Sequence, residues 1–581
     1  MENRNSNIFE KLISLYDDDQ AKIVFDKLKT LISEYKAVND EKNSEFGQLF
    51  SHKDVIMITY GNSLLKKDEN PLKTLFDFFN ENISEFINII HILPFFPYSS
   101  DDGFSVIDYL TVNPELGDWD DVLRFKSINV RLMFDAVINH ISAKSYWFQQ
   151  FLLDDPKYKD YFICVEPNID VSQVVRPRTL PLITPFETRS GKKWVWTTFS
   201  ADQIDLNYKN PDLLIDMIHI LLEYIRNGAN LIRLDAIAYL WKEPGTSCIH
   251  LPQTHKVIQL IRAIIEEVDP SILIITETNV PHQDNISYFG NGENEAHMVY
   301  QFSLPPLVAH AILAGTSEYL CKWAETLHLT SNKTTFFNFT ASHDGIGVMP
   351  LKGILPDEEI NLLYDTTIKH GGKISSKTNS DGSSSPYELN ITYYDLLNNS
   401  NEIEPEEVKN NRFIISQAIP LVLEGIPGIY IHNLLGTRNF YKGVEETGMA
   451  RSINRQKLDA NEVQSELSDS QSNRTKIFNL YKKLLLSRST EKSFHPNAKQ
   501  EIVCLSPAVF SVLRTSLDEE QKILAIHNLS NEKQSIMIDS KIFNDTLKNE
   551  LVDVLSGKKY EIVDTLSIEL SNYELIWLKY G

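Results

Sequence analysis

The chain has 581 residues, which is too long for one ordinary domain and long enough to bury a large core. Its hydrophobic content of 42% and charged content of 23% are those of a globular protein. The formal net charge of −23 argues against a general nucleic-acid surface or an anionic-membrane surface, because both require a basic excess. Any pocket for an anion must therefore be built from specific basic residues.

The sequence shows no targeting or membrane-spanning segment. The N-terminus, "MENRNSNIFEKLISLYDDDQ", lacks the apolar stretch of a signal peptide, and no run of about 18 apolar residues occurs. The cysteines, Cys164, Cys248, Cys321 and Cys504, have no metal-binding spacing and indicate a reducing compartment. We therefore expect a cytoplasmic protein with no membrane partner and no nucleic-acid partner.

The chain begins with a polar amphipathic stretch, and residues 1–50 are predicted to form an N-terminal helical extension. Short apolar, β-rich runs then alternate with helical stretches. These runs are 55–60, 87–95, 130–135, 230–235, 272–277, 298–303, 335–340 and 427–432. Eight strands alternating with helices predict an α/β fold, a (β/α)8 TIM barrel, which we assign to residues 51–490.

Two connections are too long for simple crossovers. Residues 141–208 follow the third strand, and residues 345–412, with a Gly/Ser-rich centre, follow the seventh. Both start at the C-terminal end of a barrel strand, so we predict an inserted lid domain and an extended loop region over the active face. Residues 491–581 carry short alternating runs and predict a C-terminal antiparallel β-domain.

The phrase "LIRLDAIAYL" at 231–240 places charge at the end of an apolar strand. Arg233 and Asp235 point the same way, because strand side chains alternate with period 2. An unpaired ion in a buried strand costs several kcal/mol, roughly, so the two residues either form a structural ion pair or hold a polar substrate at a barrel strand tip.

Other predicted strand tips are also polar. Strand three is followed by Asp135, Asn139 and His140, strand five by Glu277 and Asn279, and strand seven by His343 and Asp344. Carboxylates that converge in one pocket repel one another unless a cation, a proton or a substrate relieves them. Three carboxylates suit glycosyl transfer, in which one attacks the anomeric carbon and a second gives and takes a proton. Arg233 would keep Asp235 ionised for the attack.

Other chemistries fit less well. A metal site of Glu, Asp and His would need a close His pair or an HExxH motif, and neither is present. No P-loop and no strand-linked GxGxxG occurs, so nucleotide use is not indicated. We expect no metal and no cofactor.

The blocks "DAVINH", "IRLDAIAY", "IITETN" and "TASHDG" resemble, in order and spacing, the four short blocks of the α-amylase clan. "HILPFFPYSSDDGF", "RPR" and "SINR" narrow the resemblance to sucrose phosphorylases and their relatives. It runs from about residue 53 into the C-terminal domain. The resemblance implies a retaining, double-displacement barrel enzyme with a lid-like domain after strand three.

On the matching motifs, the resemblance implies that Asp235 is the nucleophile, Glu277 the general acid/base and Asp344 the transition-state stabiliser. For the glucosyl ring it implies Asp101, His140, Arg233, His343 and Arg455 as binding residues, with an aromatic wall of Phe104 and Phe199. The alternative for each Phe is ordinary packing in the core. The alternative for His140 is a buried histidine that bonds a backbone carbonyl.

Members of the family differ in the acceptor, which is water, fructose, fructose 6-phosphate, glycerol or glycerate. Guanidinium forks suit phosphate and carboxylate, and "RPR" supplies Arg176 and Arg178, of which Arg178 is the better match and Arg176 is alternatively a surface residue. By resemblance, Tyr239 and Tyr387 also contact phosphate. We therefore expect inorganic phosphate as a cosubstrate.

The acceptor side also departs from sucrose phosphorylases. Asn279 stands where they generally carry His, and "SPYELN" places Glu388 where they commonly carry other residues, including a Gln. This pattern resembles the glucosylglycerate phosphorylase branch, whose members are hexosyltransferase-type enzymes that use a small-molecule glucoside and phosphate. Sucrose, sucrose 6-phosphate and glucosylglycerol phosphorylases, a hydrolase and a non-catalytic binding relative are the alternatives. Oligomeric state stays open, with a homodimer among the expectations.

Overall fold

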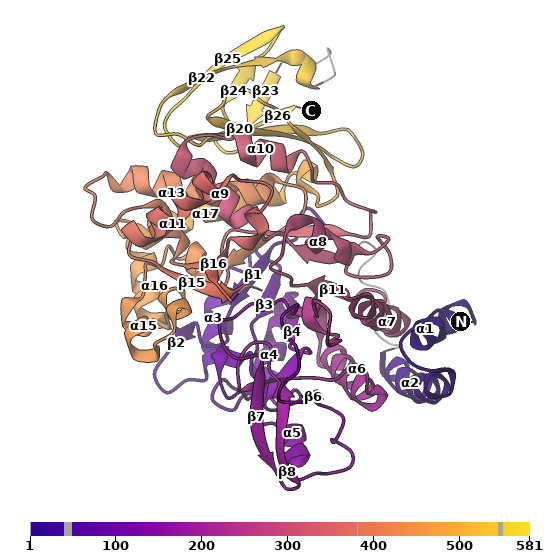
Figure 1. Cartoon of the computed structure of the whole chain (residues 1–581). Coiled ribbons are helices and arrows are strands. Elements are labelled where there is room, and N and C mark those ends of the chain that lie inside the picture. The colour runs from indigo at the N-terminus through magenta and orange to yellow at the C-terminus, as the bar shows by residue number, and fades with distance from the viewer. Residues whose placement is uncertain (1, 40–48, 380–381, 544–549, 581) are drawn as a thin grey trace.

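The computed structural model describes residues 2–39, 49–379, 382–543 and 550–580 (Figure 1). Its centre is a closed barrel of parallel strands. In chain order these strands are β1 (Ile56–Thr59), β3 (Ile89–Ile92), β4 (Arg131–Ala136), β10 (Ala229–Leu234), β11 (Leu273–Thr276), β12 (Met298–Tyr300), β13 (Thr335–Phe339) and β17 (Ile426–Tyr430). The predicted (β/α)8 barrel is confirmed, and each predicted run contains most or all of one strand.

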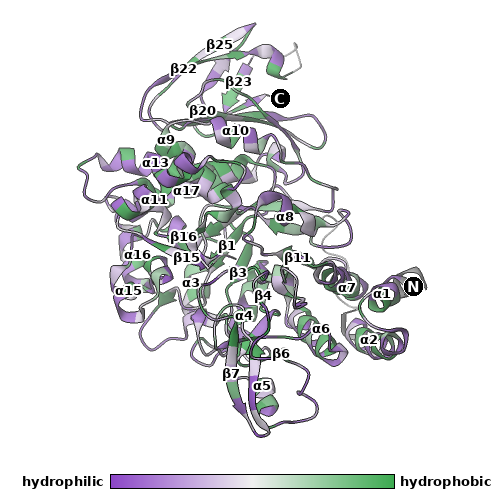
Figure 2. Cartoon of the chain, in the orientation of Figure 1, coloured by the Kyte–Doolittle hydropathy of each residue, from purple (hydrophilic) through white to green (hydrophobic). Residues whose placement is uncertain are grey.

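The barrel closes where β1 pairs with both its first and its last neighbour. Ile56 lies opposite Ile89 of β3 on one side and opposite Gly428 of β17 on the other. Position 428 has no room for a side chain, because a Cβ there would collide with the ring of Phe337. One face of each strand points into the barrel interior, and the other is covered by the surrounding helices. Both faces are therefore apolar, and the strands appear in the sequence as apolar runs. Figure 2 shows this concentration of hydrophobic residues in the barrel strands.

The N-terminal extension packs on the outside of the barrel. Helices α1 (Glu2–Ile13) and α2 (Asp18–Asn39) lie beside α6 (Pro211–Arg226) and α7 (Pro252–Val268), at the right of Figure 1. The buried residues of α2 recur with helical spacing and include Val24, Leu28 and Ile32. The hydroxyl of Tyr16 donates a hydrogen bond of 2.9 Å to the carbonyl oxygen of Tyr208, and this bond anchors the extension.

The segment after strand three forms a small antiparallel unit. β6 (Cys164–Val165), β7 (Ile183–Thr188) and β8 (Gly191–Trp196) make a three-stranded sheet, and α5 (Tyr146–Leu152) packs on it. At its base β5 (His140–Ser142) pairs with β9 (Gln203–Asp205), with His140 opposite Asp205. The insertion therefore leaves and rejoins the barrel beside the end of β4.

The segment after strand seven is more regular than the Gly/Ser-rich composition predicted. It contains α11 (Asp357–Lys369), α12 (Tyr393–Leu397) and a sheet of β14 (Ile346–Gly347), β15 (Lys373–Thr378) and β16 (Ser384–Asn390). Glu388 of β16 pairs with both Gly347 and Ser375. The polar strands of this hairpin pack against α11 and against η6 (Ala450–Asn454), so a local hydrophobic pattern could not reveal them.

The C-terminal strands form a separate layer at the top of Figure 1. A six-stranded sheet contains β19 (Lys499–Ile502), β20 (Val509–Thr515), β21 (Lys522–Asn528), β23 (Glu550–Asp553), β24 (Lys559–Glu561) and β26 (Leu575–Tyr580). β22 (Gln534–Asp539) and β25 (Thr565–Leu570) pair separately. The predicted antiparallel β-domain is confirmed, and the boundaries at residues 50 and 490 are our proposal. Among the described residues, no helix has the length and apolar character needed to cross a membrane.

A buried arginine ties the bottom of the barrel to the C-terminal layer. Arg488, on α17 (Asn473–Ser489), is fully buried. Its guanidinium donates hydrogen bonds to the carbonyl oxygens of Leu421 (2.9 Å), His52 (2.6 Å) and Phe494 (3.1 Å). These carbonyls belong to α13 (Glu406–Val422), to the segment before β1 and to the segment before β19.

We expect Arg488→Met to lower the free energy of unfolding by about 3 to 5 kcal/mol, because it leaves buried carbonyl oxygens without donors. Lys483→Met, at an exposed position of the same helix, is the matched control and should change stability by no more than about 0.5 kcal/mol. Thermal and denaturant unfolding would measure both. Equal stabilities of the two variants would contradict the role given to Arg488.

Candidate active site

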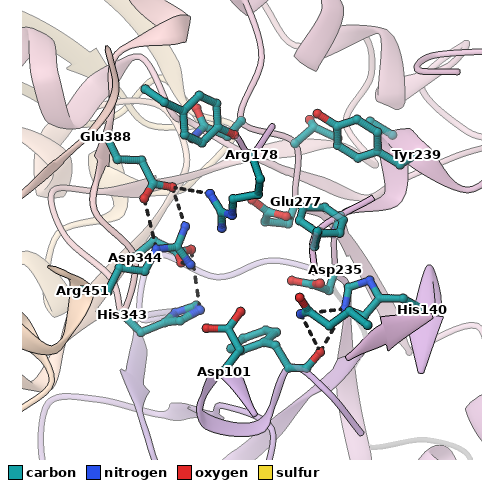
Figure 3. A pocket seen from close by; sticks show the side chains of 18 of the residues that line it. Asp101, His140, Arg178, Asp235, Tyr239, Glu277, His343, Asp344, Glu388 and Arg451 are labelled. Carbon is teal, nitrogen blue, oxygen red and sulfur yellow. Dashed lines mark hydrogen bonds and ion pairs between the residues drawn. The ribbon is translucent and has the colours of Figure 1, made fainter. Parts of the chain in front are cut away.

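A pocket lies over the C-terminal ends of the barrel strands (Figure 3). Strand ends supply part of its wall, and the segments after strands two, three, seven and eight supply much of the rest. The polar and aromatic residues that line it are Asp101, Phe104, His140, Arg178, Phe199, Gln203, Asp235, Tyr239, Glu277, Thr278, Asn279, His343, Asp344, Tyr387, Glu388 and Arg451. This is the face on which barrel enzymes carry their chemistry.

The three carboxylates expected from the strand ends face this one pocket. Asp235 follows β10, Glu277 follows β11, and Asp344 lies beyond the end of β13. The backbone N–H of Ala236 donates a hydrogen bond of 3.0 Å to Oε2 of Glu277. Ala236 has a φ of 48°, a conformation that L-residues rarely adopt. The strained turn after Asp235 therefore aims a backbone donor at the carboxylate of the next strand.

Arg233 lies behind the pocket wall and binds the carboxylates from below. Its Nη1 donates to a carboxylate oxygen of Asp135 and, at 2.8 Å, to Oδ1 of Asp235. Its Nη2 lies 3.9 Å from Oε2 of Glu277. Asp135 is held on its other side by Nε2 of His91, at 2.6 Å. The predicted pairing of Arg233 with Asp235 is present, but Arg233 is shared with two further carboxylates.

Burial raises the pKa of the Asp235 carboxyl well above its usual value, and the positive charge of Arg233 acts against that rise. Burial also raises the pKa of Glu277. We expected Arg233 to keep Asp235 ionised, but it offsets only part of the effect, because burial is the largest cause and the negative charges of Glu277 and Asp135 add to the rise. Asp235 and Glu277 therefore titrate as a pair, and a proton shared between them leaves one nucleophile and one acid.

The pKa values of Asp344 and His343 are both lowered, for different reasons. Burial disfavours the charged form of Asp344, but Arg451, His343 and Arg455 together hold its pKa below the usual range. Burial lowers the pKa of His343 to about 3, so this imidazole is neutral near pH 7. Its ring stacks on Phe104, with centroids 4.8 Å apart.

The neighbours of His140 select one tautomer of its imidazole ring. Lys242 donates a hydrogen bond of 2.7 Å to Oδ1 of Asn139, so the Asn139 amide turns its NH2 group toward Nδ1 of His140, 3.1 Å away. Nδ1 accepts, and the proton therefore lies on Nε2, which donates to the carbonyl oxygen of Phe104 at 2.9 Å. Lys242 also pairs at 2.6 Å with Asp205 of β9, which links this network to the inserted segment.

A second group of residues also lines the pocket, and we name it the acceptor group after the role that the sequence predicts for it. It consists of Arg178, Tyr239, Asn279, Tyr387 and Glu388. The guanidinium of Arg178 lies 6.0 Å from the ring centroid of Phe199 and 5.9 Å from that of Tyr387. Oδ1 of Asn279 is buried without a hydrogen-bond partner in the described part of the chain. It is therefore available to accept a hydrogen bond from a ligand.

The predicted residue Arg455 does not line the pocket but supports it from behind. Its Nε donates to the carbonyl oxygen of His343 at 2.7 Å, and its Nη1 binds Oδ2 of Asp102 at 2.7 Å and lies 3.8 Å from Oδ1 of Asp101. Both aspartates have positive φ, and Arg455 braces this strained turn. Arg176 lies away from the pocket, where it donates to the carbonyl oxygen of Leu180.

Arg451 and Gln203 are two of the lining residues that the sequence did not predict. Arg451 pairs with Asp344 at 2.6 Å and donates to Glu388 at 3.0 Å, and "ARSINR" contains it four positions before Arg455. A second arginine four positions before Arg455, in a chain with a net charge of −23, is the sequence signal that marks Arg451. Gln203 donates from Nε2 to the carbonyl oxygen of Phe104 at 3.2 Å, and no pattern in the sequence marks it.

A closed parallel barrel with three carboxylates facing one polar pocket is typical of the class of (β/α)8 enzymes that act on sugars. Comparison with known proteins agrees with this class. The family profile "Alpha amylase, catalytic domain" matches residues 86–348. The glucosylglycerate phosphorylase of Spirochaeta thermophila is 48% identical over 98% of this chain and 97% of its own length, and that of Escherichia coli is 45% identical over 90% and 92%.

More distant relatives share the fold. The sucrose phosphorylase of Bifidobacterium adolescentis is 28% identical over 71% of this chain and 82% of its own length. The crystal structure of sucrose 6F-phosphate phosphorylase from Thermoanaerobacter thermosaccharolyticum superposes with a TM-score of 0.73 at 23% identity, covering 90% of this chain and 100% of that one. The chain belongs to the sucrose phosphorylase-like branch of the α-amylase family.

The sharing of Arg233 predicts how Asp135 affects the pH dependence of the reaction. Asp135→Asn removes a negative charge that raises the pKa of Asp235, and it releases Arg233 to pair with Asp235. The pKa of Asp235 should fall, and the acid limb of kcat/KM should move to lower pH by about one unit. The exposed Asp120→Asn is the control and should leave the profile unchanged. A limb that stays in place or moves to higher pH would contradict this coupling.

Proposed function

We propose that the protein is a retaining glucosylglycerate phosphorylase. It converts 2-O-(α-D-glucosyl)-D-glycerate and phosphate into α-D-glucose 1-phosphate and D-glycerate, reversibly. The observation that carries the proposal is the 48% identity to a glucosylglycerate phosphorylase across 98% of the chain. Asn279 and Glu388 in the acceptor group, where sequence departs from sucrose phosphorylases, support the same acceptor. Its partners are thus a small-molecule glucoside and phosphate. A cytoplasmic location and a homodimeric state stay predictions.

In the first step, an Asp235 carboxylate oxygen attacks the anomeric carbon of the glucosyl group. The bond from that carbon to O2 of glycerate breaks, and Glu277 gives its proton to the departing oxygen. Burial raises the pKa of Glu277, which favours the protonated form that the acid role requires. A covalent glucosyl-enzyme and free glycerate result.

In the second step, a phosphate oxygen bonds to the anomeric carbon from the side that glycerate has left. The ester bond to Asp235 breaks, and Glu277, now ionised, takes a proton from the phosphate. Two displacements at one carbon retain its configuration. The product is α-D-glucose 1-phosphate, and both carboxyl groups return to their starting states.

The remaining donor-side residues bind the glucosyl ring in this proposal. Asp344 is ionised and accepts hydrogen bonds from sugar hydroxyls more strongly as positive charge develops on the ring. Asp101, His140 and His343 provide further polar contacts from the pocket wall. Phe104 and Phe199 offer apolar faces to the flattened ring. Arg233 and Arg455 act through the carboxylates that they hold.

The acceptor group binds phosphate and glycerate in turn. Arg178, with Tyr239 and Tyr387, supplies donors for either anion. Asn279 and Glu388 suit the hydroxyl groups of glycerate, because each has oxygen atoms that accept hydrogen bonds. Arg178 from the first insertion and Tyr387 from the second enclose this side of the pocket, which limits access of water to the glucosyl-enzyme.

Phosphate dependence and acceptor choice test the proposal directly. Glucosylglycerate with phosphate should yield glucose 1-phosphate, and omission of phosphate should reduce turnover at least about tenfold. In the reverse direction, D-glycerate should exceed fructose, fructose 6-phosphate and glycerol in kcat/KM by at least about 100-fold. Product analysis by chromatography gives both results. Free glucose formed at full rate without phosphate would instead identify a hydrolase.

Leaving-group chemistry tests the two carboxyl roles. Glu277→Gln should lower kcat on glucosylglycerate by about 10² to 10⁴, but it should release fluoride from α-D-glucosyl fluoride at a much less reduced rate, because fluoride leaves without a proton. Asp235→Asn should lose both reactions while the protein keeps its melting temperature. A Glu277→Gln variant equally impaired on both substrates would contradict its role as the acid.

A further inference from the structure

A buried carboxylate lies beside the cation that the proposed function assigns to phosphate and glycerate. Glu388 is 2% exposed, and its Oε1 is 3.8 Å from Nη1 of Arg178. Opposite charges at this distance attract strongly in a site of low polarity. A small movement would join them in a two-pronged ion pair. Such a pair would use the donors of Arg178 that an anionic ligand needs.

Arg451 already occupies the carboxylate of Glu388. Its Nε donates to Oε2 at 3.0 Å and its Nη2 donates to Oε1, so both oxygens have a partner on one guanidinium. Its remaining nitrogen, Nη1, lies 2.6 Å from Oδ1 of Asp344. Figure 3 shows Glu388 between Arg178 and Arg451, with Arg451 reaching onward to Asp344.

Contacts within the protein hold Arg451, Glu388 and Asp344 in place without a ligand. Arg451 lies in η6 (Ala450–Asn454), and Nδ2 of Asn454 donates to the carbonyl oxygen of Asp344 at 3.0 Å. Glu388 approaches because position 345 is glycine: a Cβ there would lie 2.9 Å from Cβ of Glu388. The segment after strand eight is therefore fixed to the segment after strand seven at both carboxylates.

We propose that Arg451 is a positioning residue that neutralises Glu388 and thereby keeps Arg178 available for phosphate and for the glycerate carboxylate. The same guanidinium holds Asp344, so it connects the acceptor side of the pocket to the donor side. This inference rests on the proposed phosphorylase function. Without Arg451, Glu388 would pair with Arg178, and an incoming anion would meet a cation that is already neutralised.

The test is a double-mutant cycle read out as separate kcat and KM values. Arg451→Gln should raise the KM for phosphate about tenfold, because Arg178 is captured by Glu388, and should lower kcat, because Asp344 loses its partner. Adding Glu388→Gln removes the competing charge. The double variant should recover the phosphate KM to within about threefold of wild type, while kcat stays low.

The controls separate this role from a general loss of structure. Arg438→Gln removes a guanidinium that pairs with Asp395 outside the pocket, and it should leave the phosphate KM unchanged. If Arg451→Gln melts below the assay temperature, Arg451→Lys replaces it, alone and with Glu388→Gln. Lysine keeps one positive charge but lacks the fork, so the KM should rise by a smaller factor and again recover in the double variant.

Two different failures can be told apart. A wild-type enzyme that cleaves the glucoside equally well without phosphate overturns the proposed function. A phosphate-dependent wild type whose Arg451→Gln variant keeps its phosphate KM overturns the role of Arg451 alone. Failure of Glu388→Gln to restore a raised KM also overturns it, because the defect would then not arise from competition for Arg178.

Discussion

The active face depends on one buried cation, the guanidinium of Arg233. It leaves β10 and binds Asp135 at the end of β4, Asp235 at the end of its own strand and, more distantly, Glu277 beyond β11. An isolated buried guanidinium would cost several kcal/mol, roughly, and so would the carboxylates without it. Each charge therefore requires the others. The pKa values of Asp235 and Glu277 depend in part on how one positive charge is divided among three negative ones.

A second cationic layer comes from a single short segment after strand eight. Arg451 binds Asp344 and Glu388, and Arg455 binds Asp102 and the backbone of His343. A chain with a net charge of −23 thus places the guanidinium groups of Arg233, Arg451 and Arg455 beside the carboxylates of one pocket. These groups keep Asp344 ionised, whereas Asp235 and Glu277 share a weaker cationic environment that favours a proton between them.

The two insertions complete the pocket because each lies in close contact with the barrel. Lys242 joins Asp205 of the first insertion to Asn139 of the barrel, and so orients His140. In the second insertion, Gly347 lies against Asn279, where a Cβ would be 2.5 Å from Oδ1. Acceptor contacts from segments far apart in sequence therefore have fixed positions relative to the carboxylates.

The sequence by itself determined the barrel strands and the three carboxylates at their tips. Strands buried on both faces read as apolar runs, and charge directly after such a run is a local signal. Tertiary structure decided that Arg233 and Arg455 lie behind the wall, that Arg451 and Gln203 line it, and that Arg233 does not suppress the rise in the pKa of Asp235. These features depend on which side chains from distant segments meet when the barrel closes, and on how far burial removes them from water. No local pattern along the chain predicts which distant side chains meet or how deeply each is buried.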